Sequence, residues 1–127
     1  MKKIDYILSI SFYLTNLILF ISYLYPGSIL ECFLYDNCIT QPEITKFFLI
    51  PFNHFYAFVI LSIIGILAYK NTKKINSLIK YLFLLSIILE FFQIFVPNRS
   101  FEIRDLFANI IGVTVVVVIY KIKKKYE

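Results

Sequence analysis

The strongest constraint on the fold is that four stretches of this 127-residue chain are apolar over the approximate length of a membrane span. A helix needs about 20 predominantly apolar residues to cross the hydrocarbon core of a bilayer. Helices and closed barrels are the structures that satisfy all their backbone hydrogen bonds there. The four runs are residues 7–25, 47–69, 77–96 and 105–120. We therefore expect an all-α membrane protein, one domain over residues 1–127 that folds as a bundle of four transmembrane helices.

The composition supports the membrane class. Hydrophobic residues make up 60% of the chain, whereas soluble domains contain about 45–50% apolar residues. With 3 Gly and 4 Pro, the chain has few residues suited to the turns of a short-stranded β-fold.

The basic residues indicate how the spans are oriented. Ten of the 13 Lys and Arg residues fall on one side of the predicted bundle: Lys2, Lys3, Lys70, Lys73, Lys74, Lys80, Lys121, Lys123, Lys124 and Lys125. The positive-inside rule assigns that side to the cytoplasm, so both termini are predicted to be cytoplasmic. The net charge of +5 is then a consequence of topology, and we expect no nucleic-acid partner. The first run lacks a cleavage motif and is predicted to be a retained span, not a signal peptide.

Two cysteines lie in the first loop predicted to face outward. Cys32 and Cys38 are the only cysteines of the chain. Outside the cytoplasm such a pair favours a disulfide that closes a small loop, and two unpaired thiols are the alternative. No further Cys or His accompanies them, so we expect no metal ligands and no cofactor.

Polar residues from three spans are predicted to meet in the outer third of the membrane. The second span enters from outside near His54, the third ends with Glu90 and Gln93, and the fourth begins with Asp105 and Asn109. Glu90 and Gln93 are three residues apart and share one helix face. Asp105 and Asn109 are four residues apart and also share a face. Because an ionisable residue inside the membrane costs about 2.5–3.5 kcal/mol on insertion scales, it is usually paired or functional.

The turn between the third and fourth spans is short enough to fold Arg99 over these polar residues. Arg99, Arg104 or His54 would supply a cation to Glu90. Further along the fourth span, Ala108 and Gly112 form a pair of small residues that lets a neighbouring helix approach closely.

The pattern of these residues resembles the VanZ-like family of small integral membrane proteins. The matching positions, together with an upstream "HF" that begins at His54, are Glu90, Gln93, Pro97, Arg99, Asp105, Asn109 and Gly112. Two features depart from the family pattern: Ile50 and Pro51 stand where an Asp-Lys pair is usual, and Phe58 replaces a common Tyr. The resemblance implies a bacterial envelope protein in the cytoplasmic (inner) membrane, with a link to teicoplanin-type glycopeptide susceptibility and no established reaction.

Three functions remain open at this stage. The first is a polar pocket that faces outward and binds the head group of a membrane lipid or of a lipid-linked cell-wall precursor. The predicted ligand-binding residues are His54, Glu90, Gln93, Arg99, Asp105 and Asn109. The second is an integral membrane enzyme acting on such a head group, with Glu90 or His54 as general acid or base. The third is a scaffold whose polar residues only fix helix packing, acting with a membrane protein partner or as a homo-oligomer.

Overall fold

The computed structural model describes residues 3–27, 29, 32–33, 36, 38 and 51–127. Its helices are α1 (Lys3–Leu24), α3 (Phe52–Tyr69), α4 (Ile75–Phe92) and α5 (Ile103–Tyr126). A 3₁₀ turn, η1 (Gln93–Phe95), extends α4. Within the described residues there are four helices long and apolar enough to cross a membrane and no strands. The predicted fold class is therefore confirmed, and the chain is a multi-pass membrane protein.

The helix limits differ from the predicted spans mainly at the ends. The first helix starts at Lys3, before residue 7, and the last helix extends to Tyr126, past residue 120. Both extensions contain charged residues, which a helix can carry beyond the hydrocarbon region. Residues 47–50, the predicted start of the second span, lie outside the described residues.

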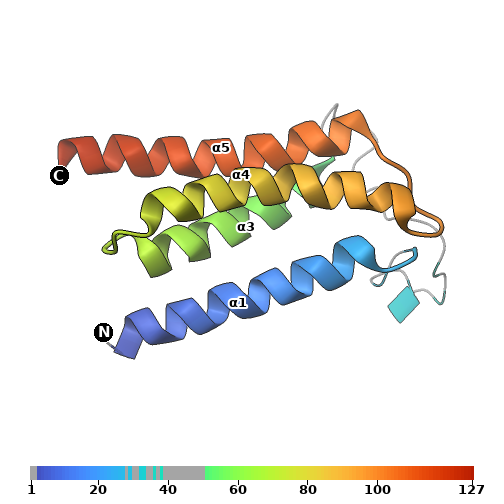
Figure 1. The fold of residues 1–127 in the computed structure, drawn as a ribbon, viewed down its shortest axis with the longest axis horizontal. Helices are drawn as coiled ribbons and strands as arrows, with labels where there is room; N and C mark the ends of the chain where they lie inside the picture. The colour runs from blue at the N-terminus through green and yellow to red at the C-terminus, as the bar shows by residue number, and fades with distance from the viewer. Residues whose placement is uncertain (1–2, 28, 30–31, 34–35, 37, 39–50) are drawn as a thin grey trace.

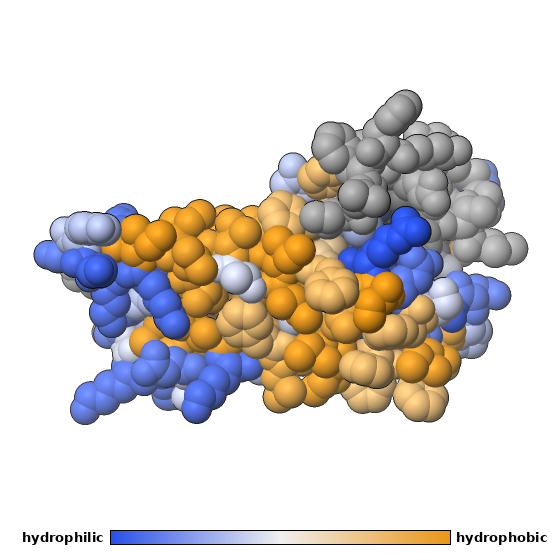
Figure 2. All heavy atoms as spheres, turned by 90° about the horizontal axis from the view of Figure 1, so that it is seen from above, coloured by the Kyte–Doolittle hydropathy of each residue, from blue (hydrophilic) through white to orange (hydrophobic). Residues whose placement is uncertain are grey.

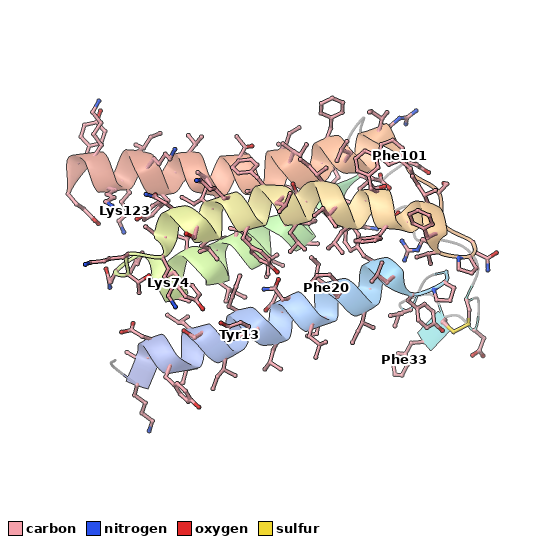
Figure 3. All side chains as sticks on the ribbon, in the orientation of Figure 1. Tyr13, Phe20, Phe33, Lys74, Phe101 and Lys123 are labelled. Atoms are coloured by element: carbon pink, nitrogen blue, oxygen red, sulfur yellow. A yellow bond between two sulfur atoms is a disulfide. The ribbon has the colours of Figure 1, made fainter. Side chains whose placement is uncertain are left out.

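The four helices run alongside one another, with both chain termini at the same end of the bundle (Figure 1). α3 makes its most extensive contacts with α5 and α1, and α4 packs chiefly against α5. Lys74 and Lys123 lie at the end that carries the termini, whereas Phe101 lies at the opposite end (Figure 3). We call these the terminal end and the loop end of the bundle.

The surface and the interior have the polarity expected in lipid. Figure 2 shows an apolar band across the middle of the molecule, with hydrophilic residues gathered at the terminal end. Large apolar side chains such as Leu17, Ile18 and Leu84 are exposed, while Phe58 and Leu82 are fully buried between helices. Exposed apolar area on this scale is a hallmark of a surface that contacts another apolar phase.

α3 and α5 approach each other closely at Gly112. A Cβ atom built on Gly112 would lie 2.6 Å from the carbonyl oxygen of Phe55 and 3.2 Å from the Cβ of Phe58. Ala108, one turn earlier on the same face, is fully buried. The predicted role of these two small residues in close helix packing is confirmed.

We predict that Gly112→Ala lowers the free energy of unfolding by about 1–3 kcal/mol, the usual cost of overpacking. The obstacle is backbone, which can move only by shifting a whole helix. Gly65→Ala is the matched control, because the added Cβ would meet the ring edge of Phe12, a side chain that can rotate. Thermal unfolding of both variants in detergent micelles measures the difference. Equal losses would contradict the backbone contact as the cause.

Candidate functional site

Five polar side chains from all four helices meet inside the loop end of the bundle. They are Tyr23 of α1, His54 of α3, Glu90 of α4, and Asp105 and Asn109 of α5. All five are buried, and Glu90 and Asn109 have no exposed surface. We refer to this group as the polar cluster.

Tyr23 lies at the centre of the hydrogen bonds within the polar cluster. Its hydroxyl donates to Asn109 Oδ1 at 2.6 Å and lies 2.9 Å from His54 Nδ1. The amide of Asn109 donates to the Ser86 carbonyl at 3.3 Å. Tyr23 thus connects α1 to α3 through His54 and to α5 through Asn109.

Two carboxylates flank the imidazole of His54. Asp105 Oδ2 lies 3.3 Å from Nε2, and Glu90 Oε2 lies 3.8 Å from Nδ1. Glu90 also accepts hydrogen bonds from the backbone amide of Glu102, at 3.2 Å, and from Asn109 Nδ2, at 3.5 Å. Each carboxylate therefore contacts the imidazole, and Glu90 in addition binds the backbone where α5 begins.

Gln93 lies one helical turn beyond Glu90 and is 2% exposed. Its Nε2 atom has no hydrogen-bond partner among the described residues. An unpaired buried amide costs about 1–3 kcal/mol, so this donor is a candidate for contact with a ligand.

The turn that follows α4 directs Arg99 toward α1. Pro97 restricts Val96 to an extended conformation, and Asn98 adopts a left-handed conformation at φ 60°, which asparagine tolerates better than most residues. The Arg99 guanidinium then donates to the carbonyls of Ser22, at 2.9 Å, and Gly27, at 2.7 Å.

Arg99 also donates through Nε to the carbonyl of Tyr25 at 3.3 Å. Burial lowers the pKa of its guanidinium, while the nearby charges of Glu90 and Asp105 raise it. An arginine remains protonated through shifts of this kind. Arg99 is thus a cation that binds the carbonyls at the end of α1, where the helix dipole is negative.

A second polar contact, nearer the terminal end, is of a plainly structural kind. Asn16 of α1 accepts a 2.6 Å hydrogen bond from the Tyr81 hydroxyl and donates to the Phe12 carbonyl at 2.9 Å. This contact between α1 and α4 contains no charged group and no unpaired amide. The polar cluster differs because it holds two carboxylates, an imidazole and the neighbouring unpaired amide of Gln93.

The structure brings most of the predicted site residues together. His54, Glu90, Asp105 and Asn109 meet in the polar cluster, with Gln93 next to Glu90 in the 3₁₀ turn. Arg99 binds α1 carbonyls through its described hydrogen bonds.

Arg104, a predicted source of a cation for Glu90, is exposed. Cys32 and Cys38, in the predicted outward loop, form a disulfide. Tyr23 was not predicted at all. Its position at the outer end of the first predicted span, level with the polar ends of the other three, was the available signal.

The fold and the site define a multi-pass membrane protein with an ionisable cluster buried at one end of a helical bundle. The sequence profile of the VanZ/LLP1 family matches residues 6–124, nearly the whole chain, and the protein belongs to that family. Comparison with curated proteins and with solved structures gives no match to this chain.

We predict that Arg99→Lys lowers the free energy of unfolding by about 1–3 kcal/mol. A lysine cannot place several donors in the planar arrangement that reaches three carbonyls, and hydrogen bonds to charged groups contribute about 1.5–3 kcal/mol. The control is Arg104→Lys, at an exposed position on the same segment. Thermal unfolding in detergent compares the two, and an equal effect at both positions would exclude a specific contact with α1.

Proposed function

We propose that this protein binds, at the extracytoplasmic end of its bundle, the polar head group of a membrane lipid or of a lipid-linked envelope precursor. The observation that carries the proposal is the buried polar cluster, beside which the Nε2 donor of Gln93 has no partner among the described residues. A ligand with oxygen acceptors would satisfy that donor.

The lysine distribution supports the orientation. The terminal end carries Lys70, Lys73 and Lys74 after α3 and Lys121, Lys123, Lys124 and Lys125 at the end of α5. An excess of lysine next to span ends marks the cytoplasmic side. The polar cluster, at the other end, then faces the extracytoplasmic leaflet of the bacterial cytoplasmic membrane.

A head group is favoured over a free metabolite because of where the cluster lies. Its residues project from membrane-spanning helices, so a ligand whose apolar chains remain in the bilayer approaches the cluster at its own depth. A precursor of this kind is also consistent with an effect on susceptibility to glycopeptides of the teicoplanin type, since those drugs act on cell-wall precursors.

The competing function is a scaffold in which the polar cluster only holds helices together. Hydrogen bonds between transmembrane helices are often structural and average about 0.6 kcal/mol. The Asn16–Tyr81 contact is of that kind. A scaffold has no use for an unpaired buried amide, and Gln93 therefore separates the two functions experimentally.

The orientation predicts the behaviour of fusion proteins. Alkaline phosphatase, which needs an oxidising compartment, should be inactive when fused after Glu127, whereas green fluorescent protein fused there should fluoresce. A fusion of the phosphatase after Asn98, in the turn at the loop end, should be active. The reverse pattern would place the polar cluster on the cytoplasmic side and contradict the proposed ligand class.

For the ligand itself, we predict that native mass spectrometry of the protein extracted from membranes detects a lipid-sized adduct. Gln93→Leu should weaken adduct binding about 5- to 150-fold, because one buried hydrogen bond of about 1–3 kcal/mol is lost.

The matched control is Ser62→Ala, which removes a buried hydroxyl that also lacks a partner among the described residues but lies on α3 outside the polar cluster. Its adduct should equal that of the wild type. If neither the wild type nor Ser62→Ala retains an adduct, or if Gln93→Leu retains it fully, the head-group proposal is wrong.

A further inference from the structure

Three potential metal ligands converge within the polar cluster. His54, Glu90 and Asp105 each offer one ligand atom, and these atoms lie within 4.8 Å of one another. Ligand bonds of about 2.0–2.2 Å in a tetrahedral arrangement separate adjacent ligand atoms by about 3.4 Å. The 3.3 Å distance between His54 Nε2 and Asp105 Oδ2 matches that separation.

The hydrogen bonds around Tyr23 determine which nitrogen of His54 carries a proton. The Asn109 amide group donates to the Ser86 carbonyl, so its Oδ1 atom is the one that faces Tyr23. The single hydroxyl proton of Tyr23 is used in that bond. Tyr23 must then accept a hydrogen bond from His54, whose Nδ1 atom lies 2.9 Å away and carries the proton.

The other nitrogen, Nε2, is consequently left with a lone pair directed toward a carboxylate. Two electron-rich atoms 3.3 Å apart in a buried site repel each other unless a proton or a metal ion lies between them. A proton on the imidazole would supply one positive charge beside two carboxylates. A divalent cation at Nε2 would supply two, and Glu90, whose Oε2 lies 3.8 Å from Nδ1 on the other side of the ring, would reach it through a shift of its side chain.

We propose that His54, Glu90 and Asp105 form a binding site for a divalent transition-metal ion such as Zn²⁺. Imidazole and carboxylate oxygen are both common zinc ligands. Histidines that bind metals nearly always donate their second N–H to a partner that orients the ring, and ligating carboxylates are hydrogen-bonded in turn. Tyr23 has that position beside His54, and the Glu102 amide has it beside Glu90.

The three ligands form no recognisable sequence motif, because each comes from a different helix. The sequence contains no two of them at a ligand spacing within one helix, so no ligand motif was available to predict this site. Helix packing, and in particular the close approach of α3 to α5 at Gly112, brings His54 and Asp105 together.

Three protein ligands leave one coordination position of a tetrahedral ion open, as in catalytic zinc sites. An ion held in this way polarises a phosphoryl or carbonyl oxygen that reaches the open position. Metal binding goes beyond the head-group proposal, and either holds without the other.

The test is a titration of the purified protein with Zn²⁺ alone, in detergent free of phospholipid. The protein carries an affinity tag without histidine and is first stripped with a chelator, and binding is measured by calorimetry with the metal content checked by elemental mass spectrometry. We expect about one Zn²⁺ per chain. Asp105→Asn and His54→Gln should each weaken binding at least tenfold.

Glu102→Gln is the matched control, since it removes an exposed carboxylate of the same segment and leaves intact the backbone amide that binds Glu90. It should bind Zn²⁺ like the wild type. Tyr23→Phe keeps all three ligands and removes only the hydroxyl that orients His54, so its affinity should fall about 10–100-fold. Circular dichroism of the metal-free proteins verifies that each variant is folded.

The proposal is overturned if the wild type binds no Zn²⁺, or if Asp105→Asn binds it as tightly as Glu102→Gln does. Full affinity in Tyr23→Phe would overturn the orienting role of that residue. Because no lipid is present, the titration is independent of the adduct experiment. Zn²⁺ binding without a lipid adduct rejects the head-group proposal alone, and an adduct without Zn²⁺ binding rejects the metal alone.

Discussion

A carboxylate enclosed by membrane-spanning helices has to find its partners inside the protein, and this requirement at Glu90 organises the loop end of the bundle. No surface of Glu90 is exposed. It accepts hydrogen bonds from the Glu102 amide, just before α5, and from Asn109, one turn after Asp105. These two hydrogen bonds fix the start of α5 relative to α4 at two points, the backbone of Glu102 and the side chain of Asn109.

The first helix depends on polar contacts more than the others do. Only 22% of the most apolar 18-residue stretch of α1 is buried inside the protein, against 39% of the corresponding stretch in each of the other three spans. Packing of similar side chains against lipid or against protein differs little in free energy, so interhelical hydrogen bonds and close contacts decide association. α1 is attached through Asn16, Tyr23 and the carbonyls that receive Arg99. These contacts lie at intervals along its length and fix its position against the other helices.

The number and type of helices were predictable because lipid leaves the backbone few choices. The convergence of His54, Glu90 and Asp105 was also predictable. The lysine distribution predicts the direction in which each span crosses the membrane, and that direction predicts the depth of each polar residue. Tyr23 was not, because it is one of 10 tyrosines, most of them unremarkable in such a chain. Nor were the carbonyls that Arg99 binds, because a backbone carbonyl carries no signature in the sequence.

The contact of Arg99 with Ser22, Tyr25 and Gly27 joins the first helix to a turn encoded more than 70 residues later. The ribosome completes α1 more than 70 residues before it adds Arg99. Until Arg99 is synthesised, these carbonyls lack the cation that binds them in the folded protein. The contact that holds the end of α1 can therefore form only after the chain has been synthesised through the turn that follows α4.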